Sequence, residues 1–209
     1  MKVLALGAHP DDIEFGCGGT LMSFARAGHE VYIYVTTCGE KGGESEIRRR
    51  EQEEAAAFEG VKELFWGGYH DTQVPLSKEL IDNIEKVMKQ IQPDYIFVHY
   101  EEDTHQDHRV LAKATLSATR YVPNFLFFEG PTTVNFSPNV YVDIEPVLDD
   151  KITLLSKHKS QVSKVIAGMP ELTIVDFALA TARFRGIQGR KKMAEAFKSL
   201  RLFLNIPRI

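Results

Sequence analysis

The stretch "KVLALGAHPDDIEFGCGGTLMSFARAGHEVYIYVTT", residues 2–37, decides the fold. Two apolar runs, residues 2–7 and 30–37, predict β-strands. Residues 20–28 between them predict a helix that ends at Gly28, because glycine favours the left-handed conformation at a helix end. A strand, a helix and a second strand in this order form a βαβ unit.

The same alternation continues along the chain. Residues 44–60, 76–91 and 106–122 predict helices, and a further helix begins near Glu145; the intervening strands are predicted at 62–66, 93–100, 124–130 and 139–144. The order predicts an α/β fold: a Rossmann-like, open and mostly parallel sheet with helices on both faces, in three α/β/α layers. The last third is less regular, and its end is predicted as helical or extended. No repeat or Pro/Ser-rich linker interrupts the chain, so we expect one domain over residues 1–209.

Composition and charge exclude several classes of partner. The 25 Lys and Arg residues nearly balance the 29 Asp and Glu residues, and the sequence pI is about 6.0. No basic excess draws the chain to nucleic acid or to an anionic membrane, so we expect a small-molecule partner. Cys17 and Cys38 form no CxxC motif, and no apolar run reaches the ~20 residues of a membrane span. The N-terminal apolar run is too short for a secretory signal, and we expect a cytoplasmic protein.

Polar side chains gather where the predicted strands end. His9, Asp11 and Asp12 follow the first strand, "GYHDTQ" follows the third, and "HYEEDTHQDHR", residues 99–109, follows the fourth. In the common strand order 3-2-1-4-5, the first and fourth strands are neighbours where the order reverses, and ligands bind at that point. We therefore expect two polar clusters nearly a hundred residues apart to meet in one crevice.

Three interpretations of "AHPDD", residues 8–12, compete. Pro10 and the two aspartates suit a helix start, where proline and carboxylates are favoured. A phosphate loop is disfavoured, because the GxGxxG spacing is absent and the carboxylates would repel a phosphate. The glycines of "GCGG", residues 16–19, suit close packing of a helix on the sheet. A metal site becomes the favoured interpretation when the cluster is combined with "HQDH", residues 105–108.

The chemistry expected of such a site is metal-assisted hydrolysis. Catalytic zinc commonly takes three ligands from His, Asp and Glu, so His9, Asp12 and one histidine of "HQDH" suffice. The neighbouring Asp11 is then free to act as a general base toward a metal-bound water, whose pKa the metal lowers toward ~7. The other histidine would stabilise an oxyanion or protonate the leaving amine, and Asp107 could orient it. The spacing alone does not assign the two histidines.

These motifs resemble the LmbE-like (PIG-L) family of zinc-dependent N-acetylglucosaminyl deacetylases. The resemblance rests on "AHPDDIEFGCGGT", "RRREQEEAAAFEGV", "HDTQV", "DTHQDHR", "HKSQ" and "RGIQGRKKMAEAF", in that order along most of the chain. It implies release of acetate from an N-acetylglucosaminyl compound and roles for nine residues. These are His9, Asp12 and His108 as metal ligands, Asp11 as the base, His105 with Asp107 as the electrostatic partner, and Arg48, Glu51 and Asp71 as sugar contacts.

Some features depart from the family pattern or stay open. Met193 stands where many relatives have tyrosine, which puts the pocket for the aglycone in doubt, and His158 of "HKSQ" receives no role beyond loop structure. The metal set also accepts Fe²⁺ or Co²⁺ in place of Zn²⁺. The resemblance implies a homo-oligomer, with a hexamer as one form. Two other functions compete: a non-catalytic protein that binds metal and amino sugar, and a metal-assisted phosphoesterase, which would need a second metal.

Overall fold

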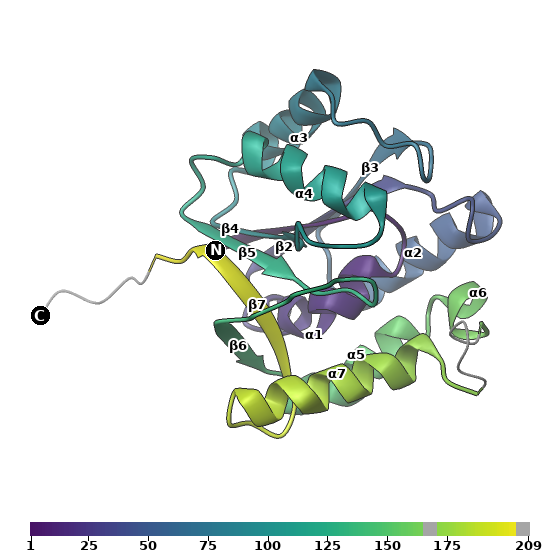
Figure 1. Ribbon diagram of the computed structural model, residues 1–209, viewed down its shortest axis with the longest axis vertical. Helices are drawn as coiled ribbons and strands as arrows, with labels where there is room; N and C mark the ends of the chain where they lie inside the picture. The colour runs from purple at the N-terminus through teal and green to yellow at the C-terminus, as the bar shows by residue number, and fades with distance from the viewer. Residues whose placement is uncertain (165–170, 204–209) are drawn as a thin grey trace, which may run out of the picture.

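A seven-stranded sheet in the order β3-β2-β1-β4-β5-β7-β6 runs through the molecule (Figure 1). The computed structural model describes residues 1–164 and 171–203. The first five strands are parallel and β7 is antiparallel to both of its neighbours. The strands are β1 (Lys2–Gly7), β2 (Glu30–Thr37), β3 (Glu63–Tyr69), β4 (Tyr95–His99), β5 (Asn124–Phe128), β6 (Val140–Asp143) and β7 (Ala194–Arg201). The predicted strand order 3-2-1-4-5 is confirmed.

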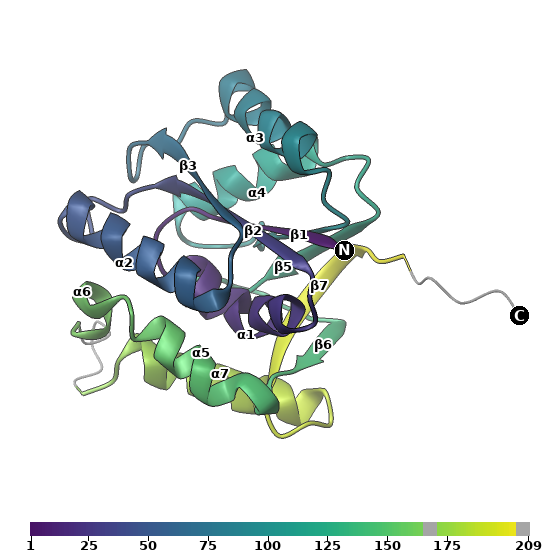
Figure 2. The ribbon, with the colours of Figure 1, turned by 180° about the vertical axis from the view of Figure 1, so that it is seen from behind.

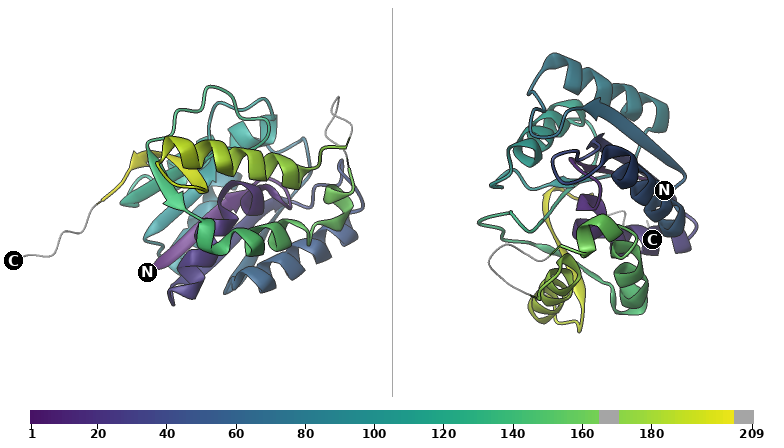
Figure 3. Two further views of the ribbon diagram at one scale, coloured as in Figure 1. Left: turned by 90° about the horizontal axis from the view of Figure 1, so that it is seen from below. Right: turned by 90° about the vertical axis from the view of Figure 1, so that its right-hand side faces the viewer.

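Helices cover both faces of this sheet, as predicted (Figures 1 and 2). On one face α3 and α4 bury apolar side chains against β1, β2, β4 and β5, and on the other α1 and α2 do so. Figure 3 shows α5 and α7 on the outer side of α1. The helices are α1 (Asp12–Arg26), α2 (Ser45–Glu59), α3 (Lys78–Ile91), α4 (Gln106–Ala118), α5 (Leu148–Leu155), α6 (Lys159–Val162), α7 (Ile174–Gln188) and the 3-10 turn η1 (Glu145–Val147).

The alternation of side chains in β1 explains why this strand lies at the centre. Leu4 and Leu6 point into the core beneath α3 and α4, whereas Val3 and Ala5 point into the core beneath α1. A strand that is apolar on both faces is stable only when both faces are covered. The carboxyl end of β1, and the loop that follows it, are therefore held between two packed layers.

Helix α1 begins at Asp12, earlier than the sequence pattern predicts, so the "GCGG" glycines lie inside it. A Cβ atom on Gly16 would lie 2.2 Å from the Phe128 ring of β5, so only glycine lets the helix approach the sheet this closely. This confirms the packing role predicted for the glycines. The helix start predicted at Pro10, Asp11 and Asp12 is confirmed: Asp11 is the N-cap residue, although its side chain makes no capping hydrogen bond.

The C-terminal part completes the sheet in a way the sequence pattern does not predict. Residues 194–201, left as helical or extended, form β7 and insert between β5 and β6. Met193, just before β7, is buried in an apolar cluster with Ile144 and Ala182 and does not line the polar cavity described below. The tail beyond residue 203 lies outside the described residues. Within the described ranges, no helix is long and apolar enough to cross a membrane.

Candidate metal centre

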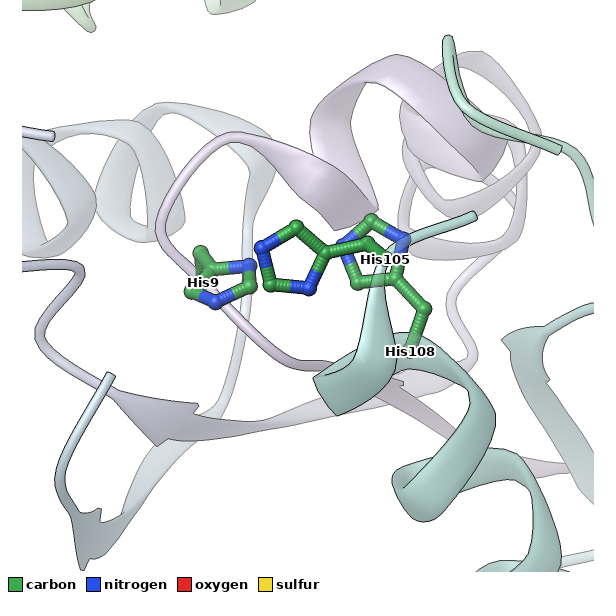
Figure 4. Close-up of side chains that lie close together, drawn as sticks. All are labelled: His9, His105 and His108. Atoms are coloured by element: carbon green, nitrogen blue, oxygen red, sulfur yellow. The ribbon is translucent and has the colours of Figure 1, made fainter. Parts of the chain in front are cut away.

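The polar clusters that follow β1, β3 and β4 meet at one edge of the sheet, as predicted. The loop after β1 supplies His9, Asp11 and Asp12, and the start of α4 supplies His105 and His108. Figure 4 shows the three imidazole rings gathered side by side. These five side chains line a cavity of about 310 Å³. The other residues that line it are Phe15, Lys41, Gly42, Arg48, Asp71, Thr72, Pro131, Thr132, Gln161 and Ile174.

Two of the predicted metal ligands, His9 and His108, each turn a ring nitrogen toward the carboxylate of the third, Asp12. Its Oδ2 atom lies 3.3 Å from His9 Nδ1 and 3.5 Å from His108 Nε2. Ligand atoms about 2.1 Å from a tetrahedral ion are separated from one another by roughly 3.4 Å. Both distances to Asp12 match this separation, and the groups of described residues able to hold a cation pair His9 with His108 and Asp12 with His108.

Each of the two histidines also turns its other ring nitrogen toward a carboxylate. His9 Nε2 lies 3.0 Å from Asp71 Oδ1 and 3.3 Å from Asp107 Oδ2, and His108 Nδ1 lies 3.2 Å from Asp103 Oδ2. A carboxylate behind a metal-ligating histidine fixes the orientation of the ring and makes it a better ligand. The arrangement is the one expected of a metal centre with an ordered outer shell.

This geometry gives Asp71 and Asp107 contacts with His9 that the sequence does not predict. The carboxylate oxygens of Asp71 face His9 and the Lys41 amide; Asp71 also lines the cavity, so the sugar contact stays a prediction. Asp107 was expected to orient His105, but its carboxylate lies against His9 and accepts hydrogen bonds from the Thr72 and Val74 amides. Both aspartates contact a predicted metal ligand, because the β3–α3 loop carries Asp71, and the first turn of α4 carries Asp107, to the His9 ring.

His99, at the end of β4, belongs to the centre although the sequence analysis gave it no role. Its Nε2 atom lies 3.1 Å from Asp12 Oδ2, and its ring stacks on His108 with centroids 3.8 Å apart. Its position at the carboxyl end of a central strand was the available signal. In the described part of the chain, the residue groups able to hold a cation share His9 or His108, so they form one centre: His9/His105/His108, Asp12/His99/His108 and His9/Asp71/Asp107.

The charges of the centre call for a cation. Burial opposes protonation of His9, but its hydrogen bonds to Asp107, Asp12 and Asp71 outweigh burial and raise its pKa to about 12. The pKa of His108 rises to about 9, because Asp12 and Asp103 outweigh burial in the same way. Without a metal ion, the aspartates are neutralised by protons on the two histidines. A divalent cation would replace those protons, so the donor set fits a metal on chemistry as well as spacing.

Asp11 has the properties of a general base. Burial raises its pKa to about 6, and Asp12 adds to this effect, whereas the nearby Arg48 opposes it. The Asp11 Oδ1 atom lies 3.6 Å from Arg48 Nη2 and lines the cavity beside the metal ligands. A carboxylate whose pKa lies near neutrality is ionised at pH 7 and still accepts a proton effectively.

His105 is arranged as a neutral hydrogen-bond donor. Its Nδ1 atom accepts a hydrogen bond from the Asp107 amide at 3.2 Å, which leaves the proton of the neutral ring on Nε2. Burial and then the neighbouring His108 and His9 lower the pKa of His105, so the neutral ring is favoured. A neutral N–H donor in the cavity suits stabilisation of an oxyanion.

The two remaining predicted sugar contacts have structural partners. Arg48 lines the cavity, but its Nη1 and Nη2 atoms donate to the carbonyl oxygens of Gly39 and Pro10, both at 2.7 Å. The Glu51 carboxylate accepts from the Ser160 amide and hydroxyl at 2.8 and 2.6 Å and does not line the cavity, so its sugar contact stays a prediction. Helix α2 therefore holds two loops through Arg48 and the start of α6 through Glu51.

Comparison with known proteins places these residues in a family context. Residues 4–119 match the family described as "PIG-L: GlcNAc-PI de-N-acetylase". The chain is 34% identical over 167 residues to the "Uncharacterized deacetylase YaiS" of Escherichia coli, covering 76% of this chain and 90% of that protein. It is 27% identical to the "Probable N-acetyl-alpha-D-glucosaminyl L-malate deacetylase 2" of Bacillus cereus, covering 78% of this chain and 85% of that protein. The solved structure of the N,N'-diacetylchitobiose deacetylase from Pyrococcus horikoshii superimposes with a TM-score of 0.84 at 26% identity, covering 95% of this chain and 83% of that one.

Proposed function

The chain belongs to the PIG-L family of de-N-acetylases, and on that premise we propose that it removes the N-acetyl group from a small N-acetylglucosaminyl compound by metal-dependent hydrolysis. The observation that carries the proposal is the placement of Asp11 beside Asp12, whose carboxylate lies between His9 and His108 in the same cavity. A metal site with a free carboxylate next to it supplies both halves of an amide hydrolysis.

The chain's own residues divide the reaction between them. A bound zinc ion would lower the pKa of a water molecule and polarise the amide carbonyl. Asp11 accepts the proton of the attacking water and can pass it to the departing amine, leaving acetate and a free amino group. His105 donates its Nε2 proton in a hydrogen bond to the oxyanion as the carbonyl carbon becomes tetrahedral. Asp71, Asp103 and Asp107 hold the two ligating histidines in place.

The substrate class follows from what the relatives share. The relatives in Bacillus cereus and Pyrococcus horikoshii are named as deacetylases of N-acetylglucosaminyl L-malate and of diacetylchitobiose. Both compounds carry an N-acetylglucosamine unit, and the family description carries the same unit. We therefore assign that unit to the cavity, with its acetamide group between Asp11 and His105.

Zinc is the metal we propose, because a set of two histidines and one aspartate near tetrahedral spacing suits it. The groups of possible ligands overlap in His9 or His108, which does not favour the two separate metals of a phosphoesterase. The homo-oligomer expected from the resemblance stays a prediction.

The Asp11→Asn variant tests the proposed base. The variant keeps the shape of the side chain and every predicted metal ligand, so we expect it to bind zinc as the wild type does and to lose most acetate release, roughly 10² to 10⁴-fold. Acetate is measured from N-acetylglucosaminyl conjugates, with zinc content determined on the same samples. Asp82→Asn, an exposed position on α3, is the control. Full turnover by Asp11→Asn would reject the mechanism.

A further inference from the structure

Asp11 has an unusual backbone conformation that its own side chain does not explain. Its φ angle is 93°, in a region that residues other than glycine rarely adopt. The side chain forms no capping hydrogen bond that would compensate. Such a conformation persists only where the surroundings fix it, and these positions cluster at functional sites.

Two side chains of α2 hold the Pro10–Asp11 peptide group from opposite sides. Arg48 Nη2 donates to the Pro10 carbonyl oxygen at 2.7 Å, and Gln52 Oε1 accepts from the Asp11 amide at 3.3 Å. The carbonyl and the N–H of a trans peptide point in opposite directions, so these two bonds fix the plane of the peptide. Arg48 and Gln52 are four residues apart and lie on the same face of the helix.

The orientation of the Gln52 amide is set by a buried acid. Gln52 Nε2 donates to Glu14 Oε1 at 2.5 Å, and neither side chain is exposed to solvent. The other Glu14 oxygen lies 3.5 Å from Nε2 of His158, which is also buried. If the amide were turned over, its NH₂ group would face the Asp11 N–H and its oxygen would face the Glu14 carboxylate. Glu14 therefore directs the Gln52 oxygen toward Asp11.

We propose that Gln52, with Glu14 and His158 behind it, is a positioning residue that holds Asp11 in its left-handed conformation and so aims the catalytic carboxylate. This inference rests on the proposed function, because it assigns Asp11 as the base. Gln52 and Glu14 act through the backbone of Asp11 and need not touch the substrate. His158, which has no role beyond loop structure in the sequence prediction, lies behind Glu14 with its Nε2 atom 3.5 Å from the second carboxylate oxygen.

The first test replaces Gln52 with methionine, which has similar length and no hydrogen-bonding amide. We expect kcat to fall roughly tenfold, because the Asp11 amide loses its hydrogen bond to Gln52, while KM and zinc content stay within about twofold of the wild type. Exchange of the Asp11 amide proton, followed by NMR, should accelerate by a similar factor. Glu59→Gln is the matched control, since Glu59 is buried beside α1 and has no hydrogen-bond partner among the described residues.

A reciprocal exchange separates positioning from a general loss of stability. Gln52→Glu alone would bring two carboxylates together and should lower kcat below that of Gln52→Met. Adding Glu14→Gln restores a donor facing an acceptor, and kcat should rise again above that of Gln52→Glu.

The inference would be overturned if Gln52→Met kept the wild-type kcat and the wild-type exchange rate of the Asp11 amide proton. It would also be overturned if the double variant showed no recovery of kcat over Gln52→Glu. A wild-type protein that releases no acetate would instead reject the proposed function, and the Asp11 exchange rates would still decide whether Gln52 holds that residue.

Discussion

The carboxylates behind the two ligating histidines give a quantitative prediction for metal affinity. His9 Nε2 has two such partners, Asp71 at 3.0 Å and Asp107 at 3.3 Å, whereas His108 Nδ1 has one carboxylate, Asp103 at 3.2 Å. Loss of an outer-shell partner typically weakens metal binding 10- to 100-fold, which corresponds to about 1.4–2.7 kcal/mol. We expect the smaller loss of zinc affinity where the histidine keeps one carboxylate partner, and the larger loss where it keeps none.

Asp71→Asn leaves Asp107 behind His9, so we expect zinc affinity to fall by about tenfold. Asp103→Asn leaves His108 without a carboxylate, and we expect a loss near 100-fold. Asp103 also accepts hydrogen bonds from the Thr132 and Thr133 hydroxyls, so unfolding must be measured on the same protein.

The assay is competition for zinc with a chromogenic chelator at fixed pH, and Asp82→Asn is again the control. Circular dichroism and a thermal melt on each variant separate a weakened site from an unfolded one. Wild-type affinity in both variants would refute the outer-shell role. A larger loss in Asp71→Asn than in Asp103→Asn would refute the ranking drawn from the geometry.

Three further predictions follow from the same contacts. The pKa of His108 is raised to about 9, so protonation of His108 stabilises the metal-free protein fully below about pH 6.5, and this stabilisation is lost as the pH rises through about 9. Urea unfolding of chelator-treated protein should therefore show lower stability at about pH 10 than at about pH 7. The opposite trend would contradict the assignment. Gly16→Ala should lower the free energy of unfolding by about 1–3 kcal/mol, because the new Cβ atom would overlap Phe128. Gly130→Ala should change it little, because a Cβ atom there would lie 3.9 Å from Thr133 Oγ1. Equal effects of the two substitutions would refute the packing argument. His105→Gln should lower kcat by roughly 10² to 10³-fold with zinc retained, as measured by acetate release, and an unchanged kcat would remove His105 from the oxyanion role.

The fold and the candidate metal ligands follow from the sequence because local signals specify them. Apolar runs separated by helical segments predict a parallel sheet, and the common strand order of such sheets, which this chain adopts, brings residues 9–12 and 105–108 together. The position of β7 was not predictable in this way. The sequence of residues 194–201 does not indicate which strands they pair with, because their hydrogen-bond partners in β5 and β6 are distant along the chain.

The outer shell depends on side-chain directions that sequence spacing does not encode. Asp71 and Glu51 each lie in a motif that suggests a sugar contact, but the former turns to His9 and the latter to Ser160. His99 was visible at a strand end, yet only the stacking on His108 shows its place in the centre. Motifs identified the region of each residue, and packing decided its partner.

The most direct test of the account is a zinc titration of the metal-free protein in which acetate release from an N-acetylglucosaminyl conjugate is measured at each step. We expect turnover to rise in proportion to added zinc and to reach its maximum at one equivalent per chain, with no such rise in a His9→Ala variant. Activity that keeps rising to two equivalents, or acetate release that is independent of zinc, would contradict a single metal centre built on His9, Asp12 and His108.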